Sequence, residues 1–210
     1  MIITRNLKEE IIEQLKTKEL VRIPASEEDY FSVAYTIPFK IEYHENEIVT
    51  MGLATYVHEK IIAQLIILFS KVFEEKNEDF DILGSNSGVQ IPKFEGGYYM
   101  PDVMIVKDEP NFKPNSNCII TNPYLIVEVL SDSTKNFDLS EKLPEYKLLD
   151  SLQQVIYINP KKVNVSTYTR TENPNAWLNQ DFYSLEDSIT VEGENISLAD
   201  IYRKIRFENR

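Results

Sequence analysis

The stretches YYMPDVMIV (98–106) and NPYLIVEVLS (122–131) decide the fold of this chain. Each is an apolar run of the kind that forms a buried strand, and each contains one carboxylate, Asp102 or Glu128. A charge in a buried strand is costly unless it is paired or binds a metal. If the two strands are neighbours, both carboxylates converge at one end of a sheet, because alternate residues of a strand share a face.

A lysine on the next predicted helix completes a candidate site. Asp138, Lys142 and Tyr146 are spaced four apart, so they share one face of a helix predicted over 138–149. That helix follows the Glu128 strand directly and can point Lys142 back at the carboxylates. Mg²⁺ takes one or two protein carboxylates, and it can polarise a phosphodiester and generate a hydroxide nucleophile. A nearby lysine stabilises the extra negative charge of the transition state, so this pattern predicts a cation site acting on phosphate.

Structural interpretations of the same residues stay open. A buried acid is often paired with an arginine or a backbone donor, and Asp138 with Lys142 can be a surface pair worth about 0.3–0.5 kcal/mol. His58 lies on the apolar face of a long helix predicted over 53–76. A single histidine there is more often a packed, hydrogen-bonded residue than a ligand.

Composition restricts the class of protein. The chain has 210 residues, of which 42% are hydrophobic and 27% charged, as expected for one large globular domain. The apolar runs are too short to span a membrane, and the single cysteine, Cys118, suits a reducing, cytoplasmic location. A net charge of −12 argues against a general nucleic-acid binder but does not exclude a nuclease, whose metal offsets local acidity.

Periodicity and turn residues divide the chain into elements. Helices are predicted over 6–20, 53–76, 138–149 and 198–205, although Pro144 is awkward inside the third. A hairpin is predicted over 39–50 with its turn at Glu45-Asn46, since asparagine tolerates the left-handed backbone of a tight turn. The remaining predictions are strands over 79–84, 86–92, 98–106, 123–130, 154–159, 162–170, 177–183 and 188–192, a polar connector over 22–29 and a loop over 107–122.

Seven pieces of the chain, taken in order, resemble the Uma-two family of restriction endonucleases. They are IEYHENEIVTM (41–51), VHEKIIAQL (57–65), YYMPDVMIV (98–106), NPYLIVEVLSDST (122–134), the D-x-x-x-K-x-x-x-Y run over 138–146, SLQQVIYINP (151–160) and WLNQDFYSLEDSITV (177–191). The resemblance covers roughly residues 38 to 205. It implies the PD-(D/E)XK nuclease fold, which is an α/β (α+β) restriction-endonuclease-like fold with a central mixed β-sheet flanked by helices.

The resemblance also assigns roles to particular residues. It implies that Asp102 and Glu128 are metal ligands for Mg²⁺ or Mn²⁺, with the backbone carbonyl of Val129 as a further ligand. The usual pattern has lysine two residues after the glutamate, where this chain has Leu130. The family moves that lysine to the following helix, where this chain has Lys142.

Glu42 and His58 also match family positions near the site, where they tune it or carry a second metal. Residues 1–37 lie outside the resemblance and are predicted to be an N-terminal helical extension, with the restriction-endonuclease-like domain over 38–210. The leading hypothesis is a magnesium-dependent endonuclease that hydrolyses DNA phosphodiester bonds, acting as a homodimer. The alternatives are a catalytically inactive nuclease-fold module for protein interaction, or a nuclease for RNA or small nucleotide substrates.

Overall fold

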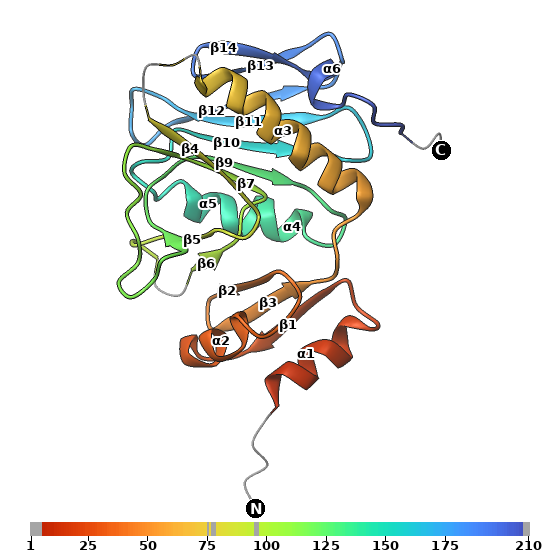
Figure 1. Cartoon of the computed structure of the whole chain (residues 1–210), viewed down its shortest axis with the longest axis vertical. Helices are drawn as coiled ribbons and strands as arrows, with labels where there is room; N and C mark the ends of the chain where they lie inside the picture. Colours follow the sequence, from red (N-terminus) through yellow and green to blue (C-terminus); the bar gives the residue numbers. More distant parts are fainter. Residues whose placement is uncertain (1–5, 75, 77–78, 95–96, 208–210) are drawn as a thin grey trace, which may run out of the picture.

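The computed structural model describes residues 6–74, 76, 79–94 and 97–207, and these form two six-stranded sheets with helices around them (Figure 1). The first sheet has the strand order β1 (Leu20–Pro24), β3 (Glu47–Met51), β2 (Ile41–His44), β6 (Tyr98–Tyr99), β5 (Gly88–Gln90) and β8 (Ile119–Ile120). The second has the order β12 (Trp177–Phe182), β11 (Val165–Arg170), β10 (Gln154–Ile158), β9 (Pro123–Val129), β7 (Val103–Lys107) and β4 (Phe80–Gly84). Each sheet is mixed, with one parallel pair. The predicted fold class is therefore confirmed, with the strands divided between two sheets.

Helices cover both faces of the second sheet. Helix α3 (Tyr56–Glu74) buries its repeating apolar residues against one face, together with the hairpin of β13 (Ser188–Val191) and β14 (Glu194–Ser197) and the short α6 (Leu198–Ile201). The opposite face packs against a helical segment made of α4 (Lys135–Phe137), the π-helix η1 (Asp138–Lys142) and α5 (Leu143–Tyr146). Figure 1 shows α3 crossing the sheet, with α4 and α5 below it. Alternate residues of β7 and β9 thus pack into two separate hydrophobic cores, one on each face of the sheet.

The predicted strand over 98–106 is wrong as one element, because the chain changes sheet in its middle. β6 ends at Tyr99 in the first sheet, and β7 begins at Val103 in the second. Pro101 has no N–H to donate to a sheet ladder, so a strand does not continue through it easily. Asp102 consequently lies at the start of β7, in the junction between the two sheets.

The predicted hairpin over 39–50 is confirmed as β2 and β3. Its turn residues Glu45 and Asn46 have φ of 46° and 65°, and a two-residue turn of type I′ needs positive φ at both positions. Glu42 and His44 point to one side of β2, and the apolar Ile41 and Tyr43 enter the core on the other. The hairpin therefore presents two buried polar side chains away from the N-terminal core.

Residues 6–37 form more than one helix and also contribute a strand. Helix α1 (Leu7–Leu15) ends earlier than predicted, and the expected polar connector over 22–29 is instead part of β1 and of α2 (Glu27–Ala34). β1 pairs with β3 because its alternating Val21 and Ile23 join the same core as α1 and α2. This segment is predicted from the sequence to be a helical extension. Its described residues instead supply strand β1 to the first sheet and pack against that sheet. The proposed boundary at residue 38 stays a prediction.

Other predicted bounds shift by a few residues. The loop over 107–122 contains β8, the closing helix is shorter than predicted, and β14 falls outside every predicted strand. The helix predicted over 53–76 is α3, although residue 75 lies outside the described residues. The helix predicted over 138–149 starts earlier, at residue 135, and ends at 146.

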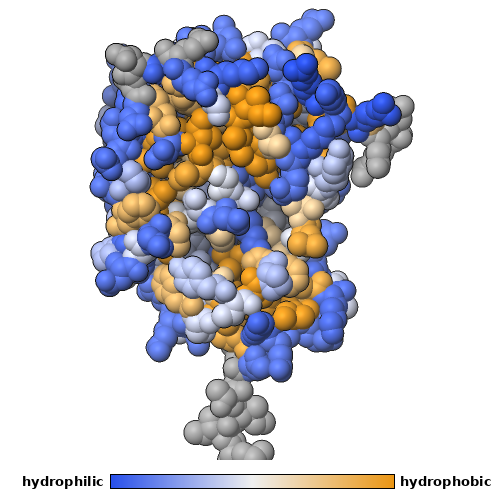
Figure 2. All heavy atoms as spheres, viewed as in Figure 1, coloured by the Kyte–Doolittle hydropathy of each residue, from blue (hydrophilic) through white to orange (hydrophobic). Residues whose placement is uncertain are grey.

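The surface over α3 is partly apolar. Figure 2 shows apolar residues gathered over the region that α3 crosses, where Ile67 is exposed. Within the described residues, no helix combines the length and apolar character that a membrane crossing needs. The predicted homodimer stays a prediction.

Candidate active site

The two carboxylates that the sequence singles out lie side by side. Val103 pairs with Val127 in the antiparallel register of β7 and β9, so the next pair outward is Asp102 and Glu128. The N–H of Asp102 donates to the carbonyl of Val127, and the N–H of Val129 donates to Asp102 Oδ2 at 2.7 Å. Both side chains are almost completely buried on the sheet face that packs against η1 and α5. The predicted convergence is therefore what the structure has.

Each of these carboxylates has one oxygen fixed by the protein. Asp102 Oδ2 is held by the Val129 N–H and by His58 Nε2 at 3.1 Å. Glu128 Oε1 accepts hydrogen bonds from the Tyr146 hydroxyl at 2.7 Å and from Lys142 Nζ at 3.1 Å. These contacts fix the orientation of both groups. The other two oxygens, Asp102 Oδ1 and Glu128 Oε2, are left facing the same side, and we call them the outer oxygens.

Lys40 contacts both outer oxygens. Its Nζ lies 2.9 Å from Asp102 Oδ1 and 3.8 Å from Glu128 Oε2, and 20% of its side chain is exposed. Lys40 directly precedes β2, so it extends from the first sheet to the carboxylates of the second. Sequence reasoning missed this residue. The signal was the alternation of Lys40, Glu42 and His44 along one side of a strand whose other side is apolar.

Lys142 is enclosed behind the carboxylates. Its Nζ lies within 3.1 Å of oxygens of Glu42, Glu128 and Asp138, and only 1% of its side chain is exposed. An ammonium group has three N–H donors, and here three carboxylates surround it. Glu42 is fixed in turn by the N–H of Met100 at 2.7 Å. We call Glu42, Asp138, Lys142 and Tyr146, with Glu128 Oε1, the interior of the carboxylate cluster.

A π-helix places Asp138 and Lys142 in this interior. The wider turn of η1 runs from Asp138 to Lys142 and is followed by Pro144 in the first turn of α5. Proline has no N–H to bond the preceding turn, and π-turns recur at functional sites. The carbonyl of Asp138 accepts a hydrogen bond from the Tyr157 hydroxyl, which ties the segment to β10. Pro144, which is unfavourable inside a regular α-helix, is thus accommodated directly after the π-helix that carries Lys142.

The ionisation state of each group in the cluster depends on the charges of its neighbours. Although burial raises it, the pKa of Asp102 is held well below its ordinary value by Lys40 and His58. Burial raises the pKa of Glu128 to about 7, against the lowering effect of Lys142. Burial lowers the pKa of Lys142, but Asp138 and Glu128 raise it well above its ordinary value. Asp102 is therefore ionised and Lys142 protonated at neutral pH.

A second polar network surrounds the buried His44, next to the interior of the carboxylate cluster. His44 Nε2 is 2.9 Å from Glu141, and its Nδ1 is 2.6 Å from the Tyr99 hydroxyl and 3.3 Å from Glu145. Burial lowers the pKa of His44, but the hydrogen bond and charge of Glu145 raise it above the ordinary value. Arg22 of β1 also pairs with Glu141 at 2.9 Å. This network joins the first sheet to the segment that holds Lys142.

The predicted site residues come together in one place. The side chains of Glu42, His58, Asp102, Glu128, Asp138, Lys142 and Tyr146 all belong to the cluster or contact it. The Asp138–Lys142 pair is buried, so the surface-pair interpretation is wrong. Val129 contributes its N–H to Asp102, and a ligand role for its carbonyl stays a prediction.

The outer oxygens suit a hard divalent cation. No group of three or more His, Cys, Asp or Glu side chains arranged to hold a metal is found among the described residues. Mg²⁺ commonly uses only one or two protein carboxylates and completes its shell with water and substrate phosphate. Asp102 Oδ1 and Glu128 Oε2 supply two such oxygens. Both already contact a positive charge, the ammonium group of Lys40.

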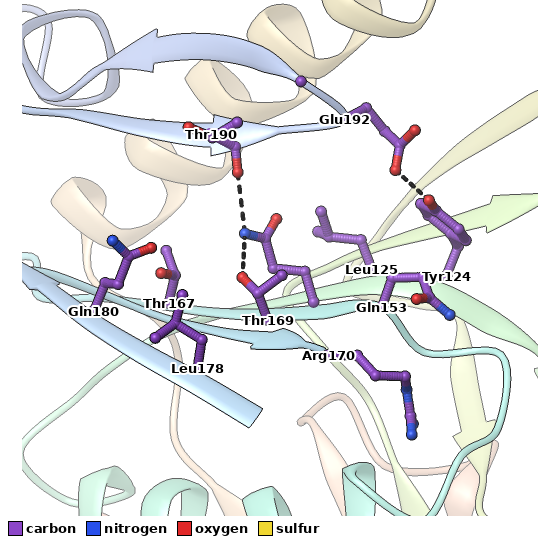
Figure 3. Close-up of a pocket in the computed structure, with 12 residues that line it drawn as sticks. Tyr124, Leu125, Gln153, Thr167, Thr169, Arg170, Leu178, Gln180, Thr190 and Glu192 are labelled. Carbon is purple, nitrogen blue, oxygen red and sulfur yellow. Dashed lines mark hydrogen bonds between the residues drawn. The ribbon is translucent and has the colours of Figure 1, made fainter. Parts of the chain in front are cut away.

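A separate cavity of about 340 Å³ opens on the opposite face of the second sheet, between β10–β12 and the β13–β14 hairpin (Figure 3). Its walls are mainly amides and hydroxyls. The Gln154 amide donates to Thr169 Oγ1 at 3.0 Å and to the Thr190 carbonyl at 3.1 Å, and Glu192 accepts from the Tyr124 hydroxyl. These polar groups bond to one another, and the lining has no cluster of carboxylates. Asp102 and Glu128 therefore stay the predicted site.

The mixed sheets and the helices around them match a nuclease-like fold. A solved structure titled as "a putative nuclease belonging to DUF820" from Anabaena variabilis matches with a TM-score of 0.65. The match covers 83% of this chain and 96% of that chain at 16% sequence identity, so it shows the fold alone.

The chain belongs to the Uma2 family, described as "Putative restriction endonuclease", whose model matches residues 28–199. Two uncharacterized proteins of Synechocystis are similar to it. One, sll1609, is 32% identical over 131 residues, which is 62% of this chain and 72% of the relative. The other, slr1290, is 30% identical over 170 residues, which is 80% of this chain and 86% of the relative.

Proposed function

We propose that this protein is a metal-dependent endonuclease that hydrolyses DNA phosphodiester bonds with Mg²⁺ or Mn²⁺. The observation that carries the proposal is the orientation of the two carboxylates. One oxygen of Asp102 and one of Glu128 are fixed by the protein, and the other two face Lys40, whose side chain is 20% exposed. Carboxylate oxygens of this kind, together with the Val129 carbonyl, would hold the cation. Membership of the Uma2 family supports the same reaction class.

A bound divalent cation supplies Lewis-acid polarisation of the phosphodiester and a more acidic water. The protein supplies the geometry. Val129 and His58 orient Asp102, while Tyr146 and Lys142 orient Glu128, so neither carboxylate has to be reorganised during the reaction. In the hydrolysis, the water oxygen bonds to phosphorus and the bond from phosphorus to the leaving oxygen breaks. One water proton ends on the leaving alcohol and the other is released to solvent.

One observation favours a catalytically inactive module instead. Asp102 and Glu128 are each already paired with a lysine, so neither carboxylate depends on a metal ion for a positively charged partner. The net charge of −12 also weakens the general attraction to a long polyanion, which favours RNA fragments or small nucleotides over duplex DNA. The same experiment separates these candidates.

The test compares the full chain with Asp102→Asn and Glu128→Gln on plasmid, duplex DNA, single-stranded DNA and RNA, each with Mg²⁺ or Mn²⁺. Both variants should lower the cleavage rate by about 100-fold or more, because each removes a charge that the cation needs. Asp132→Asn is a matched control, since this carboxylate is exposed and pairs with Lys161 on the surface. The proposal fails if the wild-type protein cleaves no substrate faster than Asp102→Asn with either metal. Preference for RNA would replace the DNA assignment.

A further inference from the structure

Two lysines contact the carboxylates, and only one is placed to meet a substrate. Lys142 is almost fully buried and forms ion pairs with three carboxylates, so its charge is already compensated within the protein. Lys40 contacts the outer oxygens and is 20% exposed. The two side chains therefore share Glu128 but approach it from opposite sides.

The backbone of Lys40 is fixed, whereas its ammonium is exchangeable. The Lys40 carbonyl accepts hydrogen bonds from Thr50 Oγ1 at 2.8 Å and from the Met51 N–H at 3.4 Å, which anchors the residue at the start of β2. Its flexible four-carbon stem leads across the junction to the second sheet. The ammonium can thus change its partner without moving the strand.

Lys40 and a divalent cation would compete for the outer oxygens of Asp102 and Glu128. The two outer oxygens that pair with Lys40 are the oxygens proposed to hold the metal. A cation held by these oxygens would displace the Lys40 ammonium from them. The ammonium would then be available to a substrate phosphate, which lysine binds as a point charge.

We propose that Lys40 is the catalytic lysine that contacts the scissile phosphate, and that Lys142 is a positioning residue that orients Glu128 from within the protein. This inference rests on the proposed phosphodiesterase function and assigns the charge-stabilising role differently from the family resemblance, which gives it to Lys142. Lys40 keeps its proton throughout, so it contributes positive charge to the transition state and no proton transfer. The carboxylates raise the pKa of Lys40 above its ordinary value although burial lowers it, which supports a charged side chain.

The test uses Lys40→Met, which keeps an unbranched, flexible side chain one atom shorter and removes its charge. Two quantities are measured: Mn²⁺ affinity by calorimetry without nucleic acid, and the cleavage rate at saturating Mn²⁺. We expect Mn²⁺ to bind at least about tenfold more tightly, because the competing ammonium is gone. We expect cleavage to fall by about 100-fold or more, as for loss of one transition-state charge. Lys40→Arg should recover at least part of the rate.

Lys93→Met is the matched control, because Lys93 is an exposed lysine that pairs with Asp150 away from the cluster. It should change neither quantity. The proposal is overturned if Lys40→Met cleaves at the wild-type rate, or if it loses cleavage while Mn²⁺ binding weakens or stays the same, as a structural role would give. Wild-type cleavage no faster than that of Asp102→Asn would instead overturn the proposed function, and this inference with it.

Discussion

The interior and the outer side of one carboxylate cluster use the same kinds of residue in different ways. In the interior, Lys142 is paired with Glu42, Glu128 and Asp138, and water has almost no access. On the outer side, Lys40 pairs with Asp102 and remains partly exposed. Charges that are buried and fully paired contribute to architecture, whereas charges at the surface can exchange partners. The two lysines therefore differ in how deeply they are buried and in how many carboxylates surround each ammonium group.

The sharpest way to break this comparison is to remove each ammonium in turn. Lys142→Met leaves three buried carboxylates without their cation, so it should cost about 3–5 kcal/mol in the free energy of unfolding. Lys40→Met should cost less than Lys142→Met, because the Lys40 side chain is 20% exposed whereas that of Lys142 is 1% exposed and contacts three buried carboxylates. Urea unfolding followed by circular dichroism measures both values.

Two further variants give this first test its controls. Adding Glu42→Gln and Asp138→Asn to Lys142→Met should restore part of the stability, since it removes the excess negative charge. Lys93→Met should be close to wild type. Equal losses for Lys142→Met and Lys40→Met would refute the distinction between the interior and the outer side.

The sequence predicts the two carboxylates and the buried strand that carries Glu128, because a charge within an apolar run is a local signal. It predicts the position of Lys142 through helical spacing, even though the turn that carries the residue is a π-helix. It misses the change of sheet at Pro101-Asp102, since strand periodicity carries no information about which sheet a strand joins. Lys40 was missed for a similar reason: its partners are more than sixty residues away in the chain, and they meet only when the two sheets pack together.

A smaller effect is expected from the tyrosine that orients Glu128. Tyr146→Phe removes the hydroxyl that donates to Glu128 Oε1 at 2.7 Å in a fully buried environment. The free energy of unfolding should fall by about 1–2 kcal/mol, because the carboxylate loses a donor that water cannot replace. Tyr35→Phe is the control, since Tyr35 is exposed, and it should lie within about 0.5 kcal/mol of wild type. A Tyr146→Phe protein as stable as wild type would show that Lys142 alone fixes Glu128.

The smallest expected effect is a change in pH dependence at the network around His44. The pKa of His44 is raised above 6.5 in the folded protein, chiefly by Glu145 against the effect of burial. A histidine with a raised folded pKa stabilises the protein fully below its unfolded pKa, and that stabilisation is lost as the pH rises through the folded value. His44→Gln should therefore lose less stability than wild type between about pH 6 and about pH 8. Thermal unfolding across this range measures the slope, and Lys93→Met should keep the wild-type slope. An unchanged slope in His44→Gln would mean that His44 stays neutral, and that hydrogen bonds rather than charge join the first sheet to the helix that holds Lys142.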